Sequence, residues 1–129
     1  MNYAKPTIGL IRIPVSDLNR AVTFYRDVIG MEVEDVLDDY GYAHLMAGTL
    51  GIGLYVPGLG GGDRKPGGTL DFQLEVDNIR HLYERLRGRK ALIPEGIFQS
   101  DDGTHCLELI DPDGNILLLT ERPAQGSRA

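Results

Sequence analysis

Residue types that mark several protein classes are scarce in this sequence. Cys106 is the only cysteine, which excludes an internal disulfide and a zinc site built from several cysteines. There is no tryptophan, so the broadest side chain for stacking on a flat ligand is missing. Acidic residues outnumber basic ones, and the formal net charge is -6. This balance argues against DNA or RNA as the main partner, because a polyanion is bound by clustered Lys and Arg.

Long hydrophobic runs are missing as well. A membrane-spanning helix needs about 20 consecutive apolar residues, and no run in this chain approaches that length. Residues 1–6 lack the charged and then apolar pattern of a signal peptide. We therefore expect no membrane partner and a cytoplasmic location. The 129 residues are 42% hydrophobic and 25% charged, which fits one globular domain over residues 1–129.

The first half of the chain predicts one strand, one helix and three further strands. Alternating apolar residues favour a strand over residues 7–15. A helix should then begin after Ser16 or Asp17 and end at Gly30. Its apolar residues follow the helical spacing and are Leu18, Ala21, Val22, Tyr25, Val28 and Ile29. Strand-like runs follow at residues 31–36, 42–46 and 50–56.

The second half repeats this order from Leu70. Phe72, Leu74 and Val76 alternate along a strand, and a helix should follow that is capped by Asp77 or Asn78 and stopped by Gly88. Further strands are predicted at 96–99, 104–110 and 115–121. Core-type positions of the two halves differ by 61 residues, as Val15 and Val76 do. The pattern predicts an α+β fold of two tandem βαβββ modules, one over about 6–57 and one over about 69–123.

The glycine-rich segment 58–68 joins the two predicted modules. Its composition suits a flexible linker. A phosphate-binding loop is the alternative, but such a loop leads into a helix N-terminus, whereas a strand pattern follows this segment. We therefore interpret it as a linker.

Two stretches resemble one known family. Residues 13–30, IPVSDLNRAVTFYRDVIG, resemble the opening of glyoxalase, bleomycin-resistance and extradiol-dioxygenase proteins, which form the vicinal-oxygen-chelate superfamily. Residues 111–118, DPDGNILL, resemble the closing hairpin of the same family. With the two modules, the resemblance covers nearly the whole chain. It implies that each module curls its sheet into half of an open barrel, and that the halves enclose a cleft that usually holds a divalent metal.

The resemblance also implies which positions would supply the metal ligands. Allowing a slip of one or two residues at the second, they are Leu10, Ile52, Asp71 and Leu118. Three of these side chains are hydrocarbon and cannot donate an electron pair to a metal, and their strand neighbours offer no donor either. We therefore expect no metal and no other cofactor. The alternative is a displaced metal site, in which His44 or His105 converges with a carboxylate such as Asp71 or Glu108.

Strand alternation predicts what the cleft would present instead of a metal. If Phe72, Leu74 and Val76 face the helix, the intervening side chains face the cleft. The expected floor consists of Leu10, Arg12, Ile52, Leu54, Asp71, Gln73, Glu75 and Leu118. Such a floor suits a small amphipathic organic ligand, and its acidic groups favour a cationic one. A salt bridge of Arg12 with Asp71 or Glu75 is an equally simple reading of these charges.

Three functional classes stay open at this stage. The leading hypothesis is a metal-free small-molecule-binding protein, such as one that confers antibiotic resistance by sequestering a drug. The second is a glyoxalase-like lyase or isomerase, with a displaced metal site or with Asp71 or Glu75 as general base. The third is a structural or regulatory dimer. A homodimer is expected because an open half-barrel leaves exposed strand edges, and the resemblance implies the same.

Overall fold

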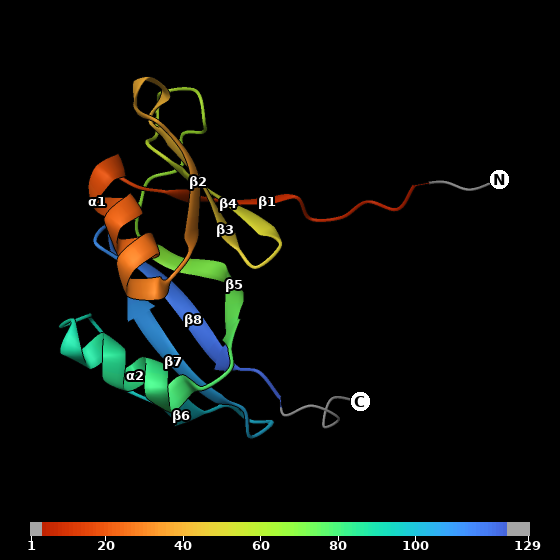
Figure 1. The fold of residues 1–129 in the computed structure, drawn as a ribbon, viewed down its shortest axis with the longest axis vertical. Coiled ribbons are helices and arrows are strands. Elements are labelled where there is room, and N and C mark those ends of the chain that lie inside the picture. Colours follow the sequence, from red (N-terminus) through yellow and green to blue (C-terminus); the bar gives the residue numbers. More distant parts are fainter. Residues whose placement is uncertain (1–3, 124–129) are drawn as a thin grey trace. The chain divides into compact units, whose positions relative to one another are not determined.

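The computed structural model describes residues 4–123, which form two units that divide between Pro66 and Gly67 (Figure 1). The division falls within the predicted linker. The elements of unit 1 are β1 (Leu10–Pro14), α1 (Leu18–Thr23), the π-helical η1 (Phe24–Ile29), β2 (Glu32–Leu37), the 3-10 turn η2 (Asp38–Tyr40), β3 (Tyr42–Ala47) and β4 (Leu50–Tyr55). Those of unit 2 are β5 (Gly68–Val76), α2 (Ile79–Gly88), β6 (Phe98–Gln99), β7 (His105–Ile110) and β8 (Asn115–Glu121). None of the helices that residues 4–123 form is both long enough and apolar enough to cross a membrane.

Each unit is built around one mixed, open four-stranded sheet. The strand order is β1-β4-β3-β2 in unit 1 and β5-β8-β7-β6 in unit 2. In both sheets the first strand of the unit pairs in parallel with the last, and the remaining neighbours are antiparallel. The two topologies are therefore the same, and neither sheet closes into a barrel. The predicted α+β class and the repeated order of one strand, one helix and three strands are confirmed.

The first helix begins where the sequence predicts it and changes character before it ends. The Asp17 side chain caps α1 by accepting a hydrogen bond from the Arg20 backbone N–H at 3.0 Å. Its predicted second half is the π-helical η1, in which Tyr25 is fully buried. Gly30 ends η1 in the left-handed region with φ 100°, where a residue without Cβ is favoured.

The second helix corrects one predicted boundary. Asn78 caps α2, with its side chain accepting from the His81 backbone N–H at 3.0 Å. Gly88 does not stop the helix, because it is still part of α2. The left-handed conformation that turns the chain away falls on Lys90, with φ 58°.

One face of each sheet forms the hydrophobic core of its unit. In unit 1 the buried face includes Ile13 of β1, Ala43 and Leu45 of β3, and Ile52 and Leu54 of β4. In unit 2 it consists chiefly of leucines, and these are Leu107, Leu109, Leu117 and Leu119. Since side chains alternate along a strand, every second residue of these strands lies on the opposite face. This second face, called the open face below, holds the polar side chains of each sheet.

A buried polar network holds the β7–β8 hairpin. Asp111 Oδ1 accepts hydrogen bonds from the backbone N–H groups of Asp113 and Asn115, both at 2.8 Å. Asp111 Oδ2 accepts from the Asn115 amide at 2.8 Å, and Asn115 Oδ1 accepts from the Gly67 backbone N–H at 2.8 Å. Asp111 is 2% exposed and Asn115 0% exposed. The DPDGN turn thus ties the hairpin to the first residue of unit 2.

Candidate functional site

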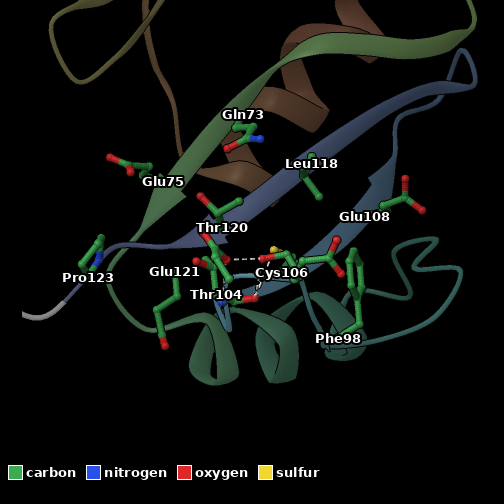
Figure 2. Close-up of a pocket in the computed structure, with 13 residues that line it drawn as sticks. Gln73, Glu75, Phe98, Thr104, Cys106, Glu108, Leu118, Thr120, Glu121 and Pro123 are labelled. Atoms are coloured by element: carbon green, nitrogen blue, oxygen red, sulfur yellow. Dashed lines mark hydrogen bonds between the residues drawn. The ribbon is translucent and has the colours of Figure 1, made fainter. Parts of the chain in front are cut away.

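The open face of the unit 2 sheet is hollowed (Figure 2). The hollow has a volume of about 780 Å³ and is lined by side chains of all four strands and of the loop between β6 and β7. Strand register arranges its floor in two rows. One row is Gln73, Leu118 and Glu108, and the next is Glu75, Thr120, Cys106 and Phe98.

The lining of this hollow is acidic. Glu75 and Glu108 lie on its floor, and further carboxylates come from Asp101, Asp102 and Glu121. None of the described residues that line it is Lys or Arg. A cation does approach from the side, since Arg122 Nε lies 4.0 Å from Glu75 Oε1 and Arg122 also pairs with Asp77. The field in the hollow therefore favours a positively charged group, most strongly on the side of Glu108.

The middle of the floor holds two less polar groups. Cys106 is 3% exposed, and its Sγ lies 3.5 Å from the Thr104 carbonyl oxygen. Its register partner Thr120 is 7% exposed and also lines the hollow. Within residues 4–123, the Thr120 hydroxyl has no hydrogen-bond partner. Because Thr120 lines the hollow, its hydroxyl is available to a bound molecule.

The loop at the rim is held by one carboxylate. Asp102 Oδ1 accepts from the Ser100 hydroxyl at 2.5 Å and from the Thr104 backbone N–H at 3.0 Å. These hydrogen bonds, led by the one from Ser100, lower the pKa of Asp102 to about 2. The rim therefore keeps its negative charge over the whole neutral and mildly acidic range.

The open face of unit 1 carries different chemistry. The Arg12 guanidinium lies over the Tyr55 ring, 5.5 Å from its centroid, and Arg12 Nη1 donates to the Gly61 carbonyl oxygen. Tyr42 Oη lies 3.2 Å from His44 Nδ1. Burial raises the pKa of the Tyr42 phenol, and the positive charge of Arg12 opposes that rise. These four side chains form a basic and aromatic cluster.

Comparison with known proteins identifies the family. A family model for the Glyoxalase/Bleomycin resistance protein/Dioxygenase superfamily matches residues 7–119. The chain belongs to this superfamily. No curated protein matches the sequence significantly.

Solved structures of the superfamily share the fold. A member from Sphaerobacter thermophilus DSM 20745 is 24% identical, with a TM-score of 0.80 over 92% of this chain and 98% of its own. A lactoylglutathione lyase from Agrobacterium tumefaciens is 20% identical, with a TM-score of 0.80 over 96% and 99%. TnmS3, an antibiotic binding protein from Streptomyces sp. CB03234, is 20% identical, with a TM-score of 0.77 over 95% and 100%.

The structure brings together three of the predicted site residues. Gln73, Glu75 and Leu118 line the hollow of unit 2. Asp71 is exposed on β5 but does not line it. In unit 1, Arg12 is exposed and Leu10 is 40% exposed, as expected for residues on the open face.

The predicted face of Ile52 and Leu54 needs correction. Ile52 is the register partner of Ile11, and Leu54 is that of Ile13, so both lie on the helix-facing side of the sheet. Both are fully buried in the core of unit 1. The open face of β4 instead belongs to Gly51 and Gly53, because a shift of one residue along a strand changes the face.

Strand register also clarifies the superfamily's metal-ligand positions. Leu118 pairs with Gln73 and Glu108 in unit 2, and Gly53 pairs with Arg12 and His44 in unit 1. The second position is therefore better assigned to Gly53 than to Ile52. Leucine at 10 and 118 and glycine at 53 offer no electron pair, so this donor set does not fit the usual divalent metal.

The histidines considered for a displaced metal site have other neighbours. His44 contacts Tyr42, whereas His105 Nδ1 lies 3.6 Å from Glu121 Oε1 and His105 Nε2 lies 3.4 Å from Gln99 Nε2. Over residues 4–123, no three side chains of His, Cys, Asp or Glu form a group that could hold a metal ion.

Several lining residues are not among the residues predicted for the cleft floor, although Glu108 is named above as a carboxylate of the alternative metal site. Cys106 and Glu108 alternate with the core residues Leu107 and Leu109, so the strand period that located Gln73 and Glu75 would also have placed them on the open face. The rim residues 100–102 lie in a loop, where no such period exists.

Proposed function

We propose that this superfamily member is a small-molecule-binding protein that holds a cationic, amphipathic organic ligand in the hollow of unit 2 without the usual metal site. The observation that carries the proposal is the mixed lining of that hollow. The Glu108 carboxylate lies beside the hydrocarbon of Leu118, and the next row of the floor holds the Glu75 carboxylate, Cys106 and Phe98. Leucine stands where a metalloenzyme of this superfamily would carry a donor.

The arrangement supports a defined binding mode. Neighbouring strands lie about 4.8 Å apart, so an ammonium group beside Glu108 places an attached apolar group over Leu118 and Phe98. In Figure 2, Glu108 and Phe98 lie toward one end of the hollow and Glu75 toward the other. Apolar contact supplies affinity in proportion to the area buried, and Thr120 and Gln73 offer hydrogen bonds that orient the ligand.

A sequestering role is the biological form of this proposal. The Streptomyces neighbour TnmS3 is named an antibiotic binding protein, so the same fold serves that purpose elsewhere. We propose that this chain binds a cationic drug or amphipathic metabolite in the cytoplasm and thereby lowers its free concentration. Such a role requires tight and saturable binding but no turnover.

Isothermal titration calorimetry tests the binding proposal. Bleomycin-type and other cationic drugs should give saturable heat with the wild-type protein. Glu108→Gln should weaken the best ligand at least about tenfold, which is 1.4 kcal/mol, because it removes the charge beside Leu118. Glu84→Gln on α2 makes the same charge change outside the lining and should leave affinity unchanged. No heat across a broad cationic library, or equal loss in both variants, would refute the proposal.

A glyoxalase-like lyase or isomerase is the second candidate. The observation that favours it is the Glu75 carboxylate on the floor of the hollow, where it could serve as a general base. This function requires turnover that Glu75→Gln abolishes. A displaced metal site would appear in elemental analysis as a stoichiometric transition metal that is lost in Asp71→Ala. Either result would replace the binding-only proposal.

We also propose that the protein is a homodimer. Each open sheet ends in edge strands, β1 and β2 in unit 1 and β5 and β6 in unit 2. Exposed edges are commonly covered by association with another chain. Size-exclusion chromatography with light scattering at micromolar concentration should give twice the chain mass, and a mass of 14.2 kDa would contradict the proposal.

A further inference from the structure

The cluster on the open face of unit 1 lies over a floor without side chains. Gly51 and Gly53 occupy this face of β4. A Cβ at Gly53 would come within 2.8 Å of Tyr42 Oη, and a Cβ at Gly51 would come within 2.8 Å of His44 Cε1. The Tyr42 and His44 side chains therefore fill the space that these two glycines leave free. Their rings are held against the sheet by the backbone of β4.

Arg12 lies beside this floor and has N–H groups that make no hydrogen bond within the described part of unit 1. Register places Arg12 next to Gly53, and His44 lies on the other side of Gly53. The guanidinium rests on Tyr55 and gives one hydrogen bond to the Gly61 carbonyl oxygen. Within residues 4–66, no carboxylate forms an ion pair with it. Because a guanidinium has five N–H donors, an edge stays available for a planar anion.

Tyr42 extends the same donor surface. Its hydroxyl lies above Gly53, between the strands of Arg12 and His44. Both groups lie next to Gly53, because Arg12 is its register partner and the Tyr42 hydroxyl lies over it. His44 Nδ1 lies 3.2 Å from Tyr42 Oη, and in the tautomer that carries its proton on Nδ1 the imidazole donates to the phenol oxygen, which leaves the single Tyr42 O–H free to donate to a ligand. Beyond His44, on the edge strand β2, the register partner is Asp35.

We propose that the open face of unit 1 binds an aromatic carboxylate, with its carboxylate between the Arg12 guanidinium and the Tyr42 hydroxyl and its ring against Tyr42 and His44. A guanidinium meets a carboxylate in a planar, two-point contact. The surface holds one permanent cation, and Asp35 adds a negative charge at its far side, so a singly charged anion fits better than a phosphate dianion. This site belongs to unit 1 and does not rest on the function proposed for unit 2.

Benzoate is a suitable probe, and NMR of protein labelled at the Tyr and His rings can follow it at constant ionic strength. Benzoate should shift the ring signals of Tyr42 and His44 in a saturable manner. Arg12→Gln should weaken this binding at least about tenfold, because it removes a charge-assisted, two-point contact. Tyr42→Phe should weaken it about threefold or more, since it removes one hydrogen bond and leaves the contact of Arg12 with Gly61 intact.

Controls separate this site from general anion binding and from the hollow of unit 2. Arg26→Gln removes an equal charge from η1 and should leave the benzoate affinity within twofold of the wild type. Benzylammonium, which has the same ring with the opposite charge, should shift the ring signals of neither Tyr42 nor His44. Inorganic phosphate should not displace benzoate. The inference is overturned if benzoate leaves these signals unchanged, if Arg12→Gln and Tyr42→Phe retain wild-type affinity, or if Arg26→Gln weakens binding as strongly as Arg12→Gln.

Discussion

The two units share one topology, yet their open faces have opposite chemistry. The row Arg12, Gly53 and His44 in unit 1 corresponds by strand register to Gln73, Leu118 and Glu108 in unit 2. In the next row, Tyr55 and Tyr42 correspond to Thr120 and Cys106. Unit 1 thus presents donors and aromatic rings over glycines, whereas unit 2 presents carboxylates around a leucine.

This contrast shows which part of the repeated module is constrained. The core faces are alike, since both consist of aliphatic side chains that the helix-facing side must bury. Apart from the buried Tyr55 and Cys106, the open-face side chains named here lie outside both cores, so they can differ without changing the register. Two copies of one module can therefore present opposite charges on their open faces.

The largest expected effect concerns the turns that close the two units. Asp111→Ala removes three acceptor contacts from the β7–β8 turn, among them the Oδ2 that accepts from the buried Asn115 amide. It should lower the free energy of unfolding by about 3 kcal/mol. The corresponding β3–β4 turn depends on Gly48, with φ 61° and open space around it. Gly48→Ala should cost only about 1 kcal/mol. Urea denaturation measures both values, and equal losses would show that the turns do not differ in this way.

A second substitution introduces at position 53 of unit 1 the leucine that unit 2 has at the equivalent position, 118. Gly53→Leu places a side chain where Tyr42 Oη lies 2.8 Å from the new Cβ, so Tyr42 must move. Overpacking of this kind should lower the free energy of unfolding by about 2 kcal/mol. Gly9→Leu adds the same side chain at a position with nothing within 4 Å and serves as the control in urea denaturation. If both variants are equally stable, Tyr42 does not depend on the bare floor.

Sequence reasoning located the open face well where polar and apolar residues alternate. In β5 the period of two separates Gln73 and Glu75 from Phe72 and Leu74, and the structure agrees. In β4 the alternation is between glycine and aliphatic residues. Ile52 is the position that the family resemblance implies, and Leu54 is two residues further along the same strand, so a slip of one residue puts both on the wrong face.

The missing information in β4 was the pairing of strands. Tyr42 and His44 lie over Gly51 and Gly53 only because of the β3–β4 register, which links residues that no local pattern connects. The contact of Arg12 with Gly61 likewise joins β1 to the segment after β4. Such long-range contacts depend on the folded backbone, whereas alternation within one strand depends on neighbouring residues alone.

A smaller effect, on ligand affinity, is expected when a positive charge is introduced into the acidic hollow of unit 2. Gln73→Arg gives the hollow the residue that unit 1 has at the equivalent position, beside Leu118. A cationic ligand should then bind about tenfold more weakly, because a like charge has been added to its site. Asp71→Asn changes the net charge equally but lies outside the lining, so calorimetry should show less than a threefold loss. If Asp71→Asn lowers the affinity as much as Gln73→Arg does, Asp71 contributes to the binding site after all.

The smallest expected effect is a pH-dependent contribution of Asp102, at the rim of the unit 2 hollow, to the melting temperature. Hydrogen bonds from Ser100 and Thr104 lower the pKa of Asp102 to about 2 in the folded protein, whereas an unfolded Asp titrates near 3.9. A lowered folded pKa stabilises the protein above the unfolded value, and this contribution is lost as the pH falls from about 4 toward 2. The melting temperature of the wild type should therefore exceed that of Asp102→Asn at pH 5, and the difference should shrink over the acid range in which the protein stays folded. Asp101→Asn makes the same charge change one residue away and should show no such convergence. A difference between wild type and Asp102→Asn that is constant from pH 5 downward would mean that the Ser100 and Thr104 contacts do not hold the charged form.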